Sequence, residues 1–346
     1  MSAAPPLVDV NLFVHNGAAT IAAAIESVLS QTWPALRLTV IDNASTDATV
    51  AIAREYCATE PRMRLHAARQ NAGAVANLQR ALSAGDADFV LPKTADDVLA
   101  PGFIARVMEV MLAEPHCAMC HAGGLVFTGA GTVRGIYPES HRLHAVGDDP
   151  VARACTVMEH YASAPSFWGV YRRDALERLA PLRYTSGYDH VMLAELALYG
   201  EIRHVPDLLY LRRDPGKPVL QIARASTEAA QRGLPLDNAL TDLRWMTPRI
   251  ANAYAHVDLF AVARLDLAQR TALMEAAPRI FRARWLPGLR QEAAGFLRAL
   301  PALAAEAARL PPAFAAWRRQ RIAEVLTAIE AIVPEADAAA HRALAA

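Results

Sequence analysis

Residues 36–47 read LRLTVIDNASTD, in which an apolar run passes directly into a polar cluster. The run from Leu36 to Ile41 is short and partly β-branched, which is typical of a buried strand. Upstream, Val8 to Val14 has the same character. Between these two runs, one face of a predicted helix carries Ile21, Ile25, Val28 and Leu29. Together these segments predict a β-α-β unit, and therefore a sheet covered by helices.

The alternation of strands and helices continues through the first 210 residues. Further helices are predicted over 47–58, 75–84, 102–114 and 189–199, and further strands over 63–67, 88–91, 167–171 and 202–210. Short runs separated by glycine predict a hairpin between Cys117 and Ile136. The fold class is therefore expected to be α/β, with a sheet flanked by helices.

The composition changes near residues 212–218, and helical periodicity dominates from Ile222 onward. We expect a first domain over residues 1–215 and an all-helical C-terminal domain over residues 216–346. Its four or five helices should be separated at prolines, namely Pro248, Pro278, Pro287, Pro301 and Pro311-Pro312. These helices either form a solvated bundle or attach peripherally to an anionic membrane through Trp285 and Trp317-Arg318-Arg319.

The composition argues against several classes of protein. The 35 basic residues balance the 35 acidic ones, which is not the charge pattern of a nucleic-acid-binding protein. The N-terminus does not resemble a secretory signal, and no apolar run approaches the roughly 18 residues of a membrane span. We therefore expect a cytoplasmic protein. Four cysteines are too few for a disulfide framework, and Cys117-Ala118-Met119-Cys120-His121 predicts buried thiols rather than a haem or zinc site.

Two polar clusters follow predicted strands, where open α/β sheets bind their ligands. The first is Asp42–Asp47, in which Asp42 could accept hydrogen bonds from a base or a ribose, while Ser45, Thr46 and Asp47 could cap the next helix. The second is Thr94-Ala95-Asp96-Asp97. Adjacent carboxylates repel each other, so this pair predicts a divalent metal ion that bridges to phosphate, or alternatively a loop or helix-cap pair.

Several motifs in order resemble the family 2 glycosyltransferases of the GT-A fold. They are VHNG at 14–17, IESVLSQT at 25–32, IDNASTD at 41–47, NAG at 71–73 and ADD at 95–97. The resemblance covers about residues 7–215. It implies a GT-A-type nucleotide-sugar-binding sheet, a nucleotide-sugar donor, an acceptor hydroxyl and inversion at the anomeric carbon.

The same resemblance implies roles on the donor side of the site. Asp42 would contact the nucleoside, and Asp96, with Asp97, would hold Mg or Mn on the donor diphosphate. The other donor-binding candidates are Asn16, Asn43, Asn71, Lys93, Thr94 and Arg212.

The metal motif and its basic neighbours leave alternatives open. Thr94 stands where the family's Asp-x-Asp motif has its first acid, so the metal either keeps more water or matters less. Lys93 could supply charge to a phosphate or lie at the surface. Arg212-Arg213 could neutralise a diphosphate, pair with acids of the site or form an ordinary surface pair.

A base is needed when an alcohol attacks, because the alcohol is a poor nucleophile at neutral pH. Asp189, in Gly187-Tyr188-Asp189-His190, matches the acid that similar enzymes use, with His190 in reserve. Alternatively, Asp189 only caps the helix that follows it. Trp168 and Tyr188 are the candidates for acceptor binding, although Trp168 could instead be a buried aromatic residue.

The expected function is sugar transfer to a glycan or lipid-linked acceptor in cell-surface polysaccharide or glycan assembly, with no nucleic-acid partner. Peripheral contact with the inner face of a membrane would suit such an acceptor. The alternative is a non-catalytic nucleotide-sugar-binding or scaffold protein in which the metal motif has degenerated at Thr94. A sugar-nucleotide-synthesising nucleotidyltransferase is disfavoured, because no glycine-rich triphosphate loop follows the first strand.

Overall fold

The computed structural model describes residues 4–129, 131–138, 143–161, 164–183, 185–214, 246–339 and 341. The described chain divides into two compact units. The sheet unit contains residues 4–182 and 196–214, and the helical unit contains residues 183–195 and 246–341. The segment 183–195 therefore groups with the C-terminal helices, although sequence analysis assigned it to the first domain.

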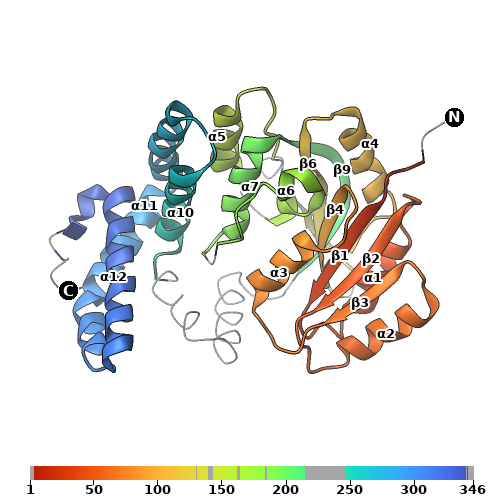
Figure 1. Cartoon of the computed structure of the whole chain (residues 1–346), viewed down its shortest axis with the longest axis horizontal. Coiled ribbons are helices and arrows are strands. Elements are labelled where there is room, and N and C mark those ends of the chain that lie inside the picture. The colour runs from red at the N-terminus through yellow and green to blue at the C-terminus, as the bar shows by residue number, and fades with distance from the viewer. Residues whose placement is uncertain are drawn as a thin grey trace. The chain divides into compact units, whose positions relative to one another are not determined.

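The sheet unit is built on one mixed sheet (Figure 1). Its strands are β1 (Val8–Val14), β2 (Leu36–Asp42), β3 (Met63–Ala67), β4 (Phe89–Thr94), β5 (Val98–Leu99), β6 (Cys117–Phe127), β7 (Val133–Ile136), β8 (Gly169–Arg172) and β9 (Glu201–Arg213). They are ordered β3-β2-β1-β4-β8-β6-β9-β5, and β7 pairs with β6. Strands β1 to β4 are parallel, whereas β8 runs antiparallel to β4 and β6. The expected α/β class and the β6–β7 hairpin are confirmed.

Helices connect the strands, most of them at the predicted places. They are α1 (Ile21–Leu29), α2 (Thr49–Thr59), α3 (Ala74–Ser83), α4 (Phe103–Ala113), α5 (Pro150–His160), α6 (Arg173–Leu176), α7 (Tyr188–Tyr199) and a 3-10 turn at Ala164–Phe167. Helix α1 buries Ile21, Ile25 and Val28, as its spacing predicted. Sequence analysis missed α5, whose signals are Asp149, which accepts a hydrogen bond from the Val151 amide, and Pro150 in the first turn.

The register of the parallel strands brings their carboxyl ends to one edge of the sheet. Val14 at the end of β1 lies beside Asp42 at the end of β2. On the other side of β1, Phe13 lies beside Thr94 at the end of β4. The two polar clusters that follow β2 and β4 therefore flank the segment that follows β1.

At the opposite end of β1, Asp9 is a buried charge with four hydrogen-bond donors. Its carboxylate is 1% exposed and accepts hydrogen bonds from the backbone amides of Asp86 and Ala87, each at 2.9 Å. The guanidinium groups of Arg37 and Arg173 lie 2.6 and 3.0 Å away. Gly85 has φ +82°, and a Cβ there would overlap the carboxylate. This network ties β1 to β2, to the turn before β4 and to the start of α6.

Three long α-helices make up most of the helical unit (Figure 1). They are α10 (Pro248–Val262), α11 (Leu267–Ala307) and α12 (Pro312–Ile332), followed by a short 3-10 turn at Pro334–Ala336. Residues 222–245, on which part of the prediction of four or five helices falls, lie outside the described residues, so that number stays a prediction; what the structure contradicts is the expected separation of helices at three of the prolines. Pro278, Pro287 and Pro301 lie inside α11. Each proline removes one backbone hydrogen bond, but α11 keeps a buried face that packs against α10 and α12, which sustains the helix across these breaks.

A carboxylate from α11 caps the start of α10. Glu292 accepts hydrogen bonds from the backbone amides of Arg249 and Ile250 at 2.9 and 3.2 Å, and from the Arg249 guanidinium at 2.9 Å. Burial raises the pKa of Glu292, although these donors act in the opposite direction. In the part of the chain that the structure describes, no helix is long and apolar enough to cross a membrane. Peripheral membrane contact stays a prediction.

Two buried histidines predict that stability falls as the pH is lowered. Burial lowers the pKa of His121 in β6 and of His256 in α10 to about 4. An unfolded histidine has a pKa near 6.5, so between about pH 6.5 and pH 4 the unfolded state binds more protons. Stability is therefore highest above this window, and each histidine should remove about 2 kcal/mol between pH 7 and pH 5.

Urea unfolding at the two pH values measures this loss. In His256→Gln the loss should shrink in the helical unit, and an unchanged pH dependence would contradict the assignment. Cys117 and Cys120, which precede His121, are buried as expected, and burial raises the pKa of both thiols.

Candidate functional site

Loops that follow β1 and β2 are hydrogen-bonded to each other at the carboxyl edge of the sheet. The Asn16 amide donates to Ser45 Oγ, and Asn16 Oδ1 accepts from the Thr46 amide, both at 2.8 Å. The Ala18 amide donates to Asp47 Oδ2 at 3.0 Å. Asn16 adopts φ 53°, a left-handed conformation that asparagine tolerates better than most residues. Asn16 therefore joins the two loops, and its amide oxygen already has a partner inside the protein.

The loop after β4 meets the loop after β1 at Gly17 and Thr20. A Cβ at Gly17 would overlap Val14 Cγ2 of β1 at 2.6 Å, and it would lie 3.5 Å from the Ala95 Cβ, an ordinary contact distance between the two loops. Thr20 lies close enough to Asp96 to oppose the rise in the pKa of that carboxyl. The loops after β1, β2 and β4 thus come together on one edge of the sheet unit.

Asp42 is the most informative side chain on this edge. It is 1% exposed, and its Oδ2 accepts a hydrogen bond from the Ser45 amide at 3.0 Å. Among the described residues, its Oδ1 is buried without a hydrogen-bond partner. A buried acceptor that lacks a donor costs free energy, so its presence suggests that a ligand supplies the donor.

Asn43 holds the neighbouring loop that contains Asn71. Its amide nitrogen donates to Asn71 Oδ1 at 2.7 Å, and its amide oxygen accepts from the Ala72 amide at 3.0 Å and from Arg80 at 3.2 Å. His15 lies between the two asparagines, 3.0 Å from the Asn43 carbonyl and 3.1 Å from the Asn71 amide nitrogen. The Asn43 side chain therefore holds the neighbouring loop in place, because its amide nitrogen and its amide oxygen both have partners within the protein.

Both carboxylate oxygens of Asp97 have hydrogen-bond partners within the protein, which favours a structural role over the predicted role as a metal ligand. Its Oδ2 accepts hydrogen bonds from the Tyr210 hydroxyl and, at 3.1 Å, from Thr94 Oγ1, and its Oδ1 accepts from the Arg213 amide at 3.0 Å. Asp97 is only 6% exposed. Its carboxylate therefore links the loop after β4 to β9 by hydrogen bonds, and the Thr94 hydroxyl belongs to the same hydrogen-bond network.

Lys93 is buried, so the interpretation as a surface lysine is wrong. It is 1% exposed, and its ammonium group donates to the backbone carbonyls of Thr94, at 2.9 Å, and Asp97. Burial lowers its pKa to about 8, although the charges of Asp97 and Asp96 act in the opposite direction. The Lys93 ammonium group therefore stabilises this loop by donating hydrogen bonds to its backbone carbonyls.

Asp96 is the carboxylate of this pair that a metal ion could reach. Its side chain is exposed, yet partial desolvation by the surrounding loops and then repulsion from Asp97 raise its pKa. A cation would relieve both effects. Magnesium is often held by one or two carboxylates together with substrate phosphates and water, so a site based on Asp96 alone fits that chemistry. Among the described residues, no group of three acidic, histidine or cysteine side chains could hold a metal by itself.

The two arginines at the end of β9 have different partners. Arg213 lies at the acidic loop, where its Nε donates to the Asp96 carbonyl at 3.1 Å and its guanidinium stacks on Phe127. Arg212 donates to the Tyr137 hydroxyl at 2.8 Å. Sequence analysis proposed Arg212 for the donor site, but in the sheet unit it is Arg213 that touches the loop of Asp96.

Trp168 has little ring surface left for a sugar. It is 9% exposed, and its ring lies 5.9 Å from that of Phe13 and 4.9 Å from that of Phe167. These contacts describe the buried aromatic residue that sequence analysis gave as the alternative. An acceptor-binding role for Trp168 is therefore not supported.

The remaining candidates belong to the helical unit. Tyr188 and Asp189 begin α7, with Asp189 inside the first turn rather than at the capping position before it. His190 is 3% exposed, and its ring packs 4.6 Å from His256 and 5.6 Å from Phe281. This burial argues against His190 as a reserve base. Asp189 keeps intermediate exposure and stays the predicted base.

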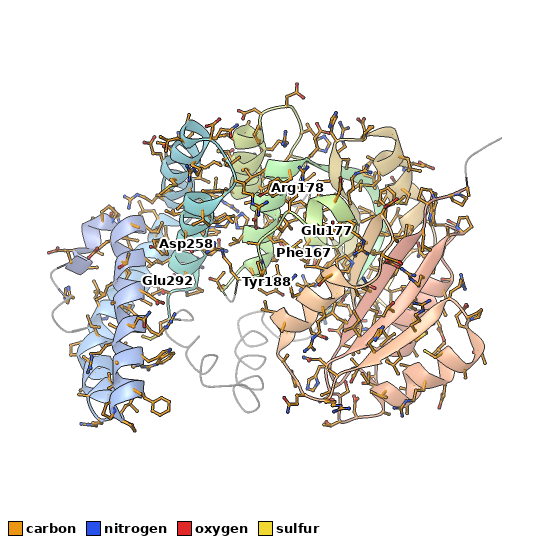
Figure 2. All side chains as sticks on the ribbon, in the orientation of Figure 1. Phe167, Glu177, Arg178, Tyr188, Asp258 and Glu292 are labelled. Carbon is orange, nitrogen blue, oxygen red and sulfur yellow. The ribbon has the colours of Figure 1, made fainter. Side chains whose placement is uncertain are left out.

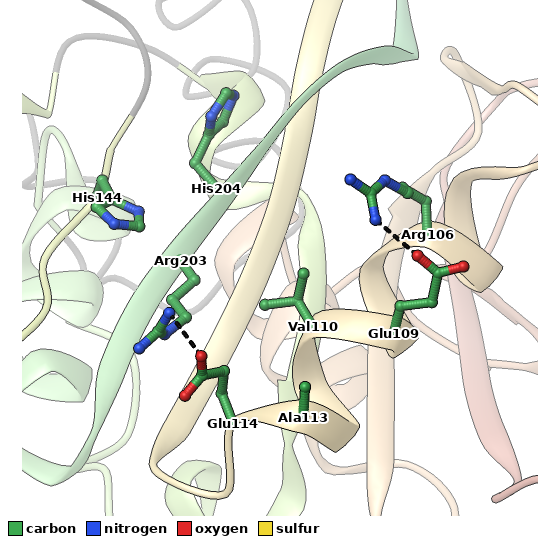
Figure 3. A pocket seen from close by; sticks show the side chains of 8 residues that line it. All are labelled: Arg106, Glu109, Val110, Ala113, Glu114, His144, Arg203 and His204. Carbon is green, nitrogen blue, oxygen red and sulfur yellow. Dashed lines mark hydrogen bonds and ion pairs between the residues drawn. The ribbon is translucent and has the colours of Figure 1, made fainter.

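A separate pocket of about 320 Å³ lies at the other end of β9 (Figure 3). Its lining includes Arg106, Glu109, Glu114, Arg203 and two histidines, His144 and His204. The charges are paired internally, with Arg106 on Glu109 at 2.6 Å and Arg203 on Glu114 at 3.1 Å. This pocket therefore offers no unbalanced charge to a phosphate or metal.

Four residues that shape the carboxyl edge were not predicted from the sequence. They are His15, Thr20, Arg80 and Tyr210. His15 directly follows β1, so its position at a strand end was a usable signal. Tyr210 is 113 residues from Asp97, and no local pattern connects the two.

Comparisons with known proteins point to one family. Residues 10–179 match the family model described as glycosyl transferase family 2. EpsE of Bacillus subtilis, which is named as a glycosyltransferase, is 33% identical over 131 residues, or 38% of this chain and 47% of EpsE. The succinoglycan biosynthesis protein ExoO of Rhizobium meliloti is 32% identical over 95 residues, or 28% of this chain and 27% of ExoO. The chain thus spans about half of EpsE and about a quarter of ExoO.

A solved structure shows the same fold. TarS 1-349 of S. aureus, in complex with UDP, superposes with a TM-score of 0.50 and 14% identity, and the match covers 80% of this chain and 91% of TarS 1-349. At this identity the likeness concerns the fold alone, which is that of the GT-A glycosyltransferases. Residues 10–179 thus form a glycosyl transferase family 2 domain.

Proposed function

We propose that this protein transfers a sugar from a nucleotide-sugar donor to an acceptor hydroxyl, with inversion at the anomeric carbon. The observation that carries the proposal is the buried Asp42 Oδ1, which has no donor among the described residues and lies at the carboxyl edge of the sheet. A nucleoside supplies the missing donor through a base N–H or a ribose hydroxyl. The UDP complex of TarS and the glycosyltransferase name of EpsE support the same class of donor.

Each step of the proposed reaction has a candidate side chain. The nucleotide binds over Asp42 with the donor diphosphate beside Asp96 and Arg213. Asp189 takes the proton of the acceptor hydroxyl as its oxygen bonds to the anomeric carbon. The bond from that carbon to the diphosphate breaks on the opposite face, and the nucleoside diphosphate leaves with the bonding electrons.

Charge on the leaving diphosphate is what the site has to stabilise. A divalent metal ion held by Asp96 would neutralise part of that charge. Arg213 places a guanidinium beside the same loop, where its Nε also bonds to the Asp96 carbonyl. For the acceptor we propose a glycan or a lipid-linked glycan of a polysaccharide pathway, because ExoO is named for succinoglycan biosynthesis.

A panel of UDP-, GDP- and dTDP-sugars, screened by thermal shift, tests the donor class. A ligand that binds the folded state raises its stability in proportion to affinity and concentration, so one nucleotide series should raise the unfolding temperature. In Asp42→Asn the dissociation constant for that nucleotide should rise about 10-fold or more, because one of the two carboxylate acceptors becomes a donor.

Asp207→Asn is the matched control, since its exposed carboxylate pairs with Arg106 near the far pocket. Equal nucleotide affinity in Asp42→Asn and the wild type would remove Asp42 from the site. No shift with any nucleotide sugar would overturn the proposed donor class.

A second candidate function has one observation in its favour. Thr94 and Asp97 bind each other, which leaves Asp96 alone in the place of the family's acidic metal motif. A nucleotide-sugar-binding scaffold protein would tolerate this loss. Binding without hydrolysis or transfer, across several acceptors and with added Mg²⁺ or Mn²⁺, would favour the scaffold over the enzyme.

A further inference from the structure

The turn before Asp189 is attached to α10 through Asn252. The Asn252 amide nitrogen donates to the backbone carbonyls of Ser186 and Gly187, each at 3.0 Å. Asn252 is 4% exposed, so water competes little for these bonds. The Gly187 carbonyl also accepts from the Val191 amide at 3.2 Å, which is the first hydrogen bond of α7. Asn252 therefore binds the chain at the point where α7 begins.

Gly187 is adapted to this attachment. Its φ is +69°, and a Cβ at this position would overlap the amide nitrogen of Asn252. Only glycine combines this backbone conformation with so close an approach at little cost. The shape of the turn and the amide of Asn252 are thus matched to each other.

Two further contacts hold the same segment on α10 and α11. His256, one helical turn after Asn252, lies 2.9 Å from the Asn252 carbonyl through its Nδ1 and packs its ring against His190. Phe281 of α11 contacts both histidine rings, at 5.6 and 4.8 Å. Arg183 forms an ion pair with Asp258 of α10, which Figure 2 labels. These contacts explain why residues 183–195 group with the helical unit.

We infer that Asn252 is a positioning residue, which sets the start of α7 so that Asp189 is aimed at the acceptor hydroxyl. The inference rests on the proposed function, in which Asp189 is the base. It assigns Asn252 of α10 a part in catalysis that acts through the position of Asp189. The Asn252 Oδ1 is buried and has no partner among the described residues, so the two bonds to the turn are what its side chain contributes.

Kinetics of the full chain test the inference through a double-mutant cycle. Asn252→Ala removes both bonds, and Asn252→Asp keeps the size but replaces the donor with an acceptor. Each should lower kcat about 10- to 100-fold and leave the donor dissociation constant unchanged, because a misplaced base costs rate rather than donor affinity. In Asp189→Asn the further change Asn252→Ala should lower kcat less than about 2-fold, since no base remains to position.

Hydrogen exchange provides a readout that does not depend on activity. Amides of residues 185–192 should exchange faster in Asn252→Ala than in the wild type. Leu300→Ala is the control, because Leu300 is fully buried in α11 and lies roughly 28 Å along the helix from Phe281 at 1.5 Å per residue. This variant should lose comparable stability without faster exchange in the turn.

The outcomes separate this inference from the proposed function. Unchanged exchange in Asn252→Ala, or a loss of kcat that persists in full without Asp189, would overturn the role of Asn252. Full turnover in Asp189→Asn would instead show that Asp189 is not the base. The hydrogen bonds of Asn252 to the turn would then have no role in catalysis.

Discussion

Replacing Asp189 by asparagine is expected to lower kcat by about 10² to 10⁴-fold, the usual contribution of a positioned general base. The amide keeps the size of the side chain and its place in the first turn of α7, but it cannot take a proton. Donor affinity should stay the same, because the groups proposed to bind the nucleotide belong to the sheet unit. Steady-state transfer kinetics over a range of pH provide the measurement, and the acidic limb of the kcat/KM profile should disappear with the carboxylate.

Asp266→Asn is the matched control for Asp189→Asn. Asp266 caps α11 and accepts a hydrogen bond from the Gln269 amide at 2.8 Å, and asparagine caps helices about as well as aspartate. This variant should keep wild-type kcat and stability. A full rate in Asp189→Asn would assign the base to another group, and an equal loss in both variants would point to a general effect on the helical unit.

The largest expected effect on stability is that of Asp9→Ala. Removing this carboxylate leaves Arg37 and Arg173, which are largely buried, without their shared partner, and it leaves two backbone amides without an acceptor. Breaking a buried ion pair from one side costs about 3 to 5 kcal/mol. We expect a loss of this size in the free energy of unfolding of the sheet unit, measured by urea unfolding at neutral pH.

Asp86→Asn is the control that compares an exposed carboxylate with the buried carboxylate of Asp9. Asp86 pairs with the same Arg37, but 84% of its side chain is exposed, so solvent and salt already weaken the interaction. Its loss should be far smaller than that of Asp9→Ala. Similar losses in the two variants would contradict the view that the buried network holds this end of the sheet.

Local sequence was sufficient for the first strands and helices but not for the end of β4. The apolar runs at 8–14, 36–41 and 63–67 were confirmed as strands to within one residue. The predicted strand at 88–91 continues to Thr94. Proline and lysine are poor residues for a central strand, and Lys93 is accommodated because the carbonyls of its own loop receive its donors.

The sequence by itself determined the order of most strands and helices of the sheet unit, and it located Asp42 and Asp96 after the strands where a nucleotide would bind. Those features depend on periodicity and turn residues within a few positions, which a single stretch of chain already contains. Only the tertiary structure decided that the Asp97 carboxylate accepts hydrogen bonds from Tyr210 and Arg213. The same holds for the hydrogen bonds of Asn252 to the turn before Asp189. These partners come together across 65 to 116 residues, and such long-range pairing depends on how packed elements meet rather than on local pattern.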